Sequence, residues 1–261
     1  MTIFLHEMRR CRLSLIIWSA VIAFMLAVCI IIYPEMSSQM NEISEMFANM
    51  GSFSEAFGMD QVNFGDFLGY FAIECGNTLG LGGAIFASII GTSVLAKEER
   101  DHTAELLLTH PVSRTRVLSE KLCSLVAQIF ILDLSVVLVS LVCMLIIGEE
   151  MPADTFAFIF ISYFLMKIEI AMITFCFSAF IRRGSLGIGI GVSMGFYFIN
   201  ILANLTEEVE FLKYITPFAY ADGADIVANN SLNITYLLIG ALISIAACVI
   251  AYLKYTKKDI S

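Results

Sequence analysis

Four ionisable residues stand inside long apolar stretches of this 261-residue chain, where charged side chains are unusual. They are Glu74, Asp133, Lys167 and Glu169. A charged group near the middle of a membrane-spanning helix costs roughly 2.5 to 3.5 kcal/mol on insertion scales, unless it is paired or reaches water. Such residues can form an ion pair between helices or line a polar pathway for a transported molecule.

Asp133 and Lys167 occupy similar depths in two successive apolar stretches. With a rise of about 1.5 Å per residue, they lie about 17 Å and about 21 Å from the basic ends of their predicted helices. We expect a structural ion pair between them, and contact with a substrate is the alternative. Glu169 follows Lys167 by two residues and cannot share its helix face, so it should pair elsewhere or face a wet cavity. Glu74 is predicted to line a pathway.

Six apolar stretches are long enough to cross a bilayer, which takes about 20 helical residues. The sequence therefore predicts an all-α, polytopic membrane protein with a single transmembrane domain over residues 1–261. The predicted spans are Leu13 to Tyr33, Phe67 to Ala96, Leu122 to Ile147, Thr155 to Ile181, Ser185 to Ala203 and Tyr236 to Leu253.

The basic residues are distributed unevenly among the segments that connect the spans. Thirteen of the 15 Lys and Arg residues fall on one side, whereas Lys213 is the single basic residue among the many acidic ones on the other. The positive-inside rule places the basic side and both termini in the cytoplasm. We expect the membrane to be a bacterial plasma membrane. The net charge of −9 arises mostly from the outer loops, so nucleic acid binding is not expected.

Several chemical functions have no support in the sequence. All three His residues fall on the cytoplasmic side, without the Cys or carboxylate spacing of a metal site. No Ser/His or Asp/Asp pair occurs at a common depth, so we expect no intramembrane enzyme. The chain also lacks a G-x-x-x-x-G-K-[ST] loop and cannot hold ATP phosphates in that way. We therefore expect no metal or cofactor in this chain.

Two further patterns concern packing. Methionines between Met36 and Met50 recur at helical spacing, which predicts an amphipathic helix along the outer interface. In the last outer segment, Pro217 is expected to begin a short helix before the last span. Small residues recur every four positions in two spans, which predicts close helix packing within or between protomers. These residues are Gly76, Gly80 and Ala84, and Gly187, Gly191 and Gly195.

The connection between the second and third spans is the most informative polar segment. It carries three consecutive leucines, Leu106 to Leu108, in a short helix that should end before Pro111. Either lipid or a partner protein must cover these leucines. Val112 to Lys121 is predicted to be an amphipathic lead-in to the third span, whose basic residues face the inner leaflet. Those residues are Arg114, Arg116 and Lys121.

The stretch from Glu99 to Lys121, within a six-span plan, resembles the signature loop of permease subunits of type 2 ATP-binding-cassette exporters. The approach to the second span, Phe64 to Phe71, is also similar to theirs. In that family the loop forms a cytoplasmic coupling helix that inserts into a cleft on a separate ATPase subunit. The resemblance implies that the docking surface comprises Glu99, Thr103, Glu105, Leu106, Leu107 and Leu108, and that Pro111, Ser113 and Arg114 fix the turn into the third span.

The same resemblance implies a function. The chain would be a permease subunit that couples ATP hydrolysis, by a partner ATPase holding ATP and Mg, to export of an unidentified substrate. A second permease protomer, identical or related, would complete the membrane core within the surrounding membrane lipid. An ATPase-independent carrier or channel is the alternative, and co-purification of an ATPase distinguishes the two.

Overall fold

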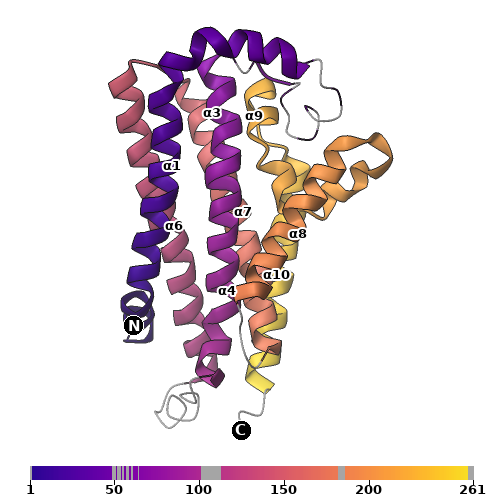
Figure 1. Cartoon of the computed structure of the whole chain (residues 1–261). Helices are drawn as coiled ribbons and strands as arrows, with labels where there is room; N and C mark the ends of the chain where they lie inside the picture. Colours follow the sequence, from indigo (N-terminus) through magenta and orange to yellow (C-terminus); the bar gives the residue numbers. More distant parts are fainter. Residues whose placement is uncertain are drawn as a thin grey trace.

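The protein is all helical over the residues that its computed structural model describes, which are 2–48, 51, 54, 56, 59, 61–63, 65–100, 113–181 and 186–257 (Figure 1). Six helical stretches are long and apolar enough to cross a membrane, which confirms the six predicted spans. They are Ile3–Ser37, Phe67–Ala96, Arg114–Ile147, Ala153–Phe180, Leu186–Leu205 and Ile234–Lys257.

The second span is divided by a π-helical segment, η1, and two 3-10 helices, η2 and η3, precede the last span. As predicted, Pro217 begins one of these short helices. In chain order the elements are α1 (Thr2–Ala48), α3 (Phe67–Cys75), η1 (Gly76–Leu81), α4 (Gly82–Arg100), α6 (Arg114–Ile147), α7 (Ala153–Phe180), α8 (Leu186–Leu205), η2 (Glu207–Tyr214), η3 (Pro217–Tyr220), α9 (Gly223–Asn229) and α10 (Ile234–Lys257).

Helix α1 continues past Pro34 without a break and ends at Ala48. Because proline removes a backbone donor and bends a helix, the continuation turns across the end of the bundle (Figure 1). The predicted helix after the first span is therefore joined directly to it. Its amphipathic character remains a prediction, because the side chains beyond residue 37 on α1 lie outside the described part of the structure.

Helix α7 lies at the centre of the bundle and contacts α4, α6, α8, α9, α10 and η3. The second span is the most buried of the six, whereas α8 and α10 bury little of their surface. In Figure 1 α8 leans away from the remaining helices. The core therefore consists mainly of α7 and the second span, whereas α8 and α10 each leave a face exposed.

The second span approaches α7 through glycines. A Cβ atom on Gly76 would lie 2.9 Å from the Tyr163 hydroxyl, and one on Gly80 would lie 3.0 Å from the ring of the same residue. The predicted glycine spacing of this span thus permits packing inside one chain. On α8, by contrast, a Cβ on Gly191 or Gly195 would meet nothing within 4 Å.

Gly91 offers a test of the close contact between α4 and α7. A Cβ there would overlap the Thr174 hydroxyl and lie 2.9 Å from the carbonyl oxygen of Ala171. We expect Gly91→Ala to destabilise the protein by about 1 to 3 kcal/mol through overpacking, measured as a lower unfolding temperature in detergent. Gly191→Ala is the matched control and should leave that temperature unchanged. Equal unfolding temperatures for both variants would contradict the packing.

Candidate functional site

Lys167 joins three helices in the middle of the bundle. It is fully buried, and its ammonium group donates to Asp133 Oδ1 on α6, so that the two residues form an ion pair. Its aliphatic stem lies beside α4, where a Cβ on Gly83 would be 2.6 Å from Lys167 Cδ. The structure thus brings together the two charges whose pairing the sequence predicts.

Glu169 lies on another side of α7 and is also buried. Its carboxylate accepts a hydrogen bond of 2.8 Å from the Tyr220 hydroxyl of η3. It also lies against α10, because a Cβ on Gly240 would overlap the same carboxylate. As expected from its position two residues after Lys167, Glu169 uses a separate partner.

Glu74 is half-buried and lies two residues before the π-helical segment of the second span. Its carboxylate faces α1, where the Cys29 thiol donates to it over 3.5 Å. Its neighbours Ile73 and Asn77 line the pocket described below, and Glu74 does not. A role of Glu74 in a transport pathway therefore stays a prediction.

The predicted position of Lys121 at the lipid surface is wrong. This residue is fully buried, and its ammonium group donates to Glu7 Oε1 over 2.7 Å and to the Val94 carbonyl over 3.0 Å. These contacts join α6 to α1 and α4. The sequence reasoning missed Glu7, because its pairing with Lys121 depends on how α1 and α6 are rotated about their axes.

The predicted docking segment is described at its two ends. Ser113 caps α6 by accepting the Arg116 amide, and Arg114 donates to the carbonyls of Tyr255 and Thr256 near the end of α10. Cations are favourable at the C-terminal end of a helix. Glu99 is in the last turn of α4, with its side chain outside the described part. The other predicted docking residues, all outside the described residues, are Thr103, Glu105, Leu106, Leu107, Leu108 and Pro111.

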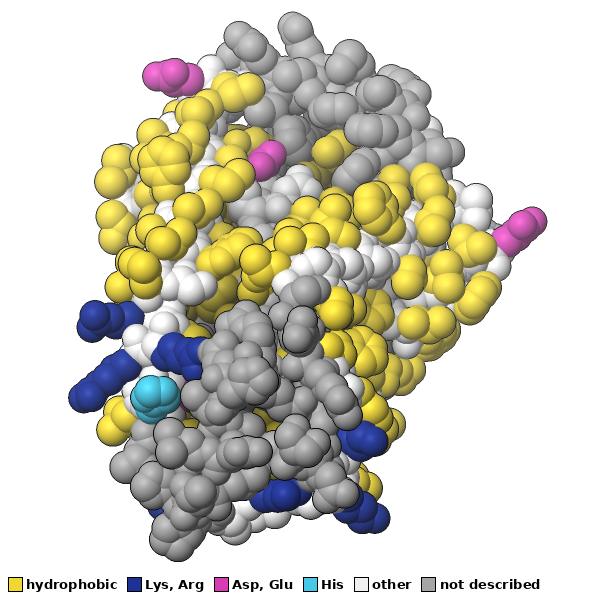
Figure 2. All heavy atoms as spheres, turned by 60° about the horizontal axis from the view of Figure 1, so that its bottom comes forward, with side chains coloured by type: hydrophobic (Ala, Val, Ile, Leu, Met, Phe, Trp, Pro, Cys, Tyr) yellow, Lys and Arg dark blue, Asp and Glu magenta, His cyan; other side chains and the backbone are white. Residues whose placement is uncertain are grey.

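Basic side chains gather at the end of the bundle where α1 begins and α10 ends. Figure 2 brings this end forward and shows Lys and Arg around its rim, while the Asp and Glu side chains visible there lie farther away. Arg9, Arg10, Arg116 and Lys254 belong to this end of their helices. The ends of α4 and α6 that flank the docking segment are therefore in basic surroundings.

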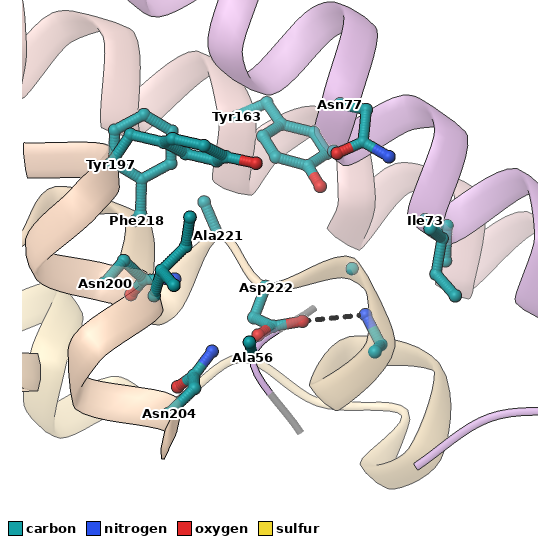
Figure 3. A pocket seen from close by; sticks show the side chains of 15 residues that line it. Ala56, Ile73, Asn77, Tyr163, Tyr197, Asn200, Asn204, Phe218, Ala221 and Asp222 are labelled. Carbon is teal, nitrogen blue, oxygen red and sulfur yellow. Dashed lines mark hydrogen bonds between the residues drawn. The ribbon is translucent and has the colours of Figure 1, made fainter. Parts of the chain in front are cut away.

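A pocket lies toward the opposite end, between the second span, α7, α8 and the segment from η3 to α9. Its volume is about 70 Å³, and its polar lining residues are Asn77, Tyr163, Tyr197, Asn200, Asn204 and Asp222 (Figure 3). Asp222 caps α9 through its Oδ1 atom, which accepts the amides of Ala224 and Asp225. Burial raises the pKa of the Asp222 carboxyl group, although these two amides act in the opposite direction.

Comparison with known protein families decides the identity of the chain. The family model described as "ABC-2 family transporter protein" matches residues 1–260. The chain belongs to the ABC-2 transporter family. No curated protein matches it. This ABC-2 family protein is accordingly a multi-pass transport permease that is not itself catalytic, and its family implies association with an ATP-binding-cassette ATPase.

Within the described part of the permease, no three His, Cys, Asp or Glu side chains are grouped so as to hold a metal ion. Its buried charges instead make hydrogen bonds with neighbouring helices, which gives them a structural role in this ABC-2 protein.

The structural role of the central ion pair can be tested by removing one charge and then both. Lys167→Met should destabilise the permease by about 3 to 5 kcal/mol, because Asp133 is left buried and unpaired. Adding Asp133→Leu should recover much of that loss, since the uncompensated charge is removed as well. Thermal unfolding of the purified variants measures both effects. A double variant no more stable than Lys167→Met would show that the two residues act independently.

Proposed function

We propose that this chain is the membrane subunit of an exporter driven by a separate ATPase, which binds ATP and Mg and docks on the segment from Glu99 to Arg114. The observation that carries this proposal is the match of the ABC-2 family model to almost the whole chain. The uneven distribution of basic residues supports a cytoplasmic position for the docking segment. Both termini would then also be cytoplasmic, in a bacterial plasma membrane.

The helices that flank the docking segment are suited to transmit a movement. Lys121 on α6 donates to the Val94 carbonyl on α4, and both helices contact α7. A displacement of the segment by the ATPase would therefore move α4 and α6 together. The chain can respond to ATP only if its docking segment contacts the ATPase differently in the two nucleotide states.

A second copy of the chain, or a related permease, would pack along α8. This helix exposes large apolar residues, and its Gly191 and Gly195 positions are open. Small residues on a membrane helix allow the backbone of a neighbouring helix to approach closely. The exposed face of α8 is therefore suited to a protomer interface, whereas the glycines of the second span are already covered by α7.

Leu107→Asp tests the docking segment, because a charge among the three leucines cannot enter an apolar cleft without a large cost. We expect at least a tenfold loss of the ATPase that co-purifies with the permease, measured by quantitative mass spectrometry. Leu5→Asp, at an exposed position near the beginning of α1, is the matched control and should retain the ATPase. An unchanged yield of ATPase with Leu107→Asp would favour an ATPase-independent carrier.

Gly191→Leu tests the protomer interface, since the leucine side chain would occupy the space that a partner helix needs. We expect dimer formation to weaken about tenfold or more, measured by light scattering during size-exclusion chromatography in detergent. Ala20→Leu introduces the same side chain at an exposed position of α1 and should leave the dimer intact. A normal dimer with Gly191→Leu would move the interface away from α8.

A further inference from the structure

The pocket beside α9 contains buried polar atoms without partners. The Tyr163 side chain is 1% exposed, and its hydroxyl makes no hydrogen bond of good geometry with the described residues, although the backbone amide of Gly223 lies near its oxygen. Asn200 Oδ1 is likewise buried and without a partner there. Buried polar groups are nearly always hydrogen-bonded, and leaving one unpaired costs free energy. These atoms therefore point to a molecule that completes their hydrogen bonds.

The Tyr163 hydroxyl is held in position by glycines on two sides. A Cβ on Gly76 would lie 2.9 Å from it, and a Cβ on Gly223 would lie 3.2 Å from it. The ring itself packs against Gly80. Because larger residues at these positions would crowd the tyrosine, the packing fixes the hydroxyl where it borders the pocket. In Figure 3 this hydroxyl points toward the side of the pocket where Asp222 lies.

The charge of the pocket favours a cation. Asp222 is the only charged residue in its described lining. The capping bonds of Asp222 use Oδ1, and Oδ2 accepts no hydrogen bond from the described residues. Lys213, which has a weak favourable effect on the same carboxylate, donates to Glu210 over 3.4 Å and does not line the pocket. An anion would thus meet a carboxylate without a compensating basic group in the lining.

Aromatic rings add a second attraction for a cation. Tyr197 and Phe218 line the pocket together with Tyr163, and their rings pack edge to face with centroids 5.5 Å apart. The faces of such rings attract ammonium groups. At about 70 Å³ the pocket is large enough for a small ammonium head group.

We propose that this pocket binds an ammonium group, held by the Asp222 carboxylate, the Tyr163 hydroxyl and the Asn200 amide oxygen. The group belongs either to the head of an aminophospholipid or to an amine on the transported molecule. Binding is a property of this chain alone. The proposal therefore goes beyond the ATP-driven export described above and is tested without an ATPase.

The test uses the purified, delipidated full chain in detergent and ethanolamine as the probe, at constant ionic strength. Ethylene glycol, which replaces the ammonium group by a neutral hydroxyl, is the control ligand. We expect ethanolamine to raise the unfolding temperature saturably, because a ligand bound only to the folded state stabilises it. Ethylene glycol should have no such effect. Equal effects of the two compounds, or no effect of either, would show that the ammonium group is not recognised and would overturn the proposal.

Three variants locate the binding. Asp222→Asn keeps the cap of α9 and removes the charge, so the apparent affinity for ethanolamine should fall about tenfold or more. Tyr163→Phe removes the hydroxyl and keeps the ring against its glycines, so the protein should fold normally while binding several-fold more weakly. Asp225→Asn, outside the pocket but on the same helix, should bind like the wild type. Wild-type affinity in Asp222→Asn would overturn the proposal.

The source of the ammonium group is distinguished in lipid nanodiscs. If a phospholipid head group occupies the pocket, ethanolamine binding should disappear in phosphatidylethanolamine and persist in phosphatidylglycerol. If an amine of the transported molecule is the ligand, ethanolamine should bind in both lipids. Absence of binding in phosphatidylglycerol would contradict both forms of the proposal.

Discussion

The polar side chains of α7 lie against glycines of the surrounding helices, and the rest of the bundle depends on this contact. Lys167 packs beside Gly83, Glu169 packs beside Gly240, and Tyr163 occupies the space left by glycines of the second span. Helices in a membrane gain little from the hydrophobic effect, because lipid is as apolar as they are. Close approach and internal hydrogen bonds therefore hold the helices together, and these bonds satisfy the buried charges of Lys167 and Glu169.

This arrangement divides the bundle into a fixed part and an open part. The ion pair of Lys167 with Asp133 joins α7 to α6, and the contacts of Lys121 with Glu7 and Val94 join α6 to α1 and to the second span. The faces of α8 and α10 remain largely exposed. In an exporter of two protomers, the fixed part would transmit force from the ATPase, and the open faces would form the boundaries that change during transport.

The sequence predicts much of the fold but less of the candidate sites. Span positions follow from hydropathy, and the pairing of Asp133 with Lys167 follows from their similar depth. The environment of Lys121 could not be predicted, because it depends on how three helices are rotated about their axes. The pocket escaped detection for a similar reason, since Tyr163 and Asp222 meet only when α7 and the segment before α10 are placed together. The glycine spacing of the second span indicated a close helix contact, but the sequence did not show that Tyr163 is the residue that packs there.

The most direct test of the account is photo-crosslinking in living cells from a light-reactive amino acid at position 106, within the predicted docking segment. The account predicts an adduct between the permease and an ATP-binding-cassette subunit, whose yield changes when ATP hydrolysis is blocked. Adducts to lipid alone, or labelling of position 106 by a reagent confined to the cell exterior, would contradict the central claim that this segment receives the force of ATP hydrolysis.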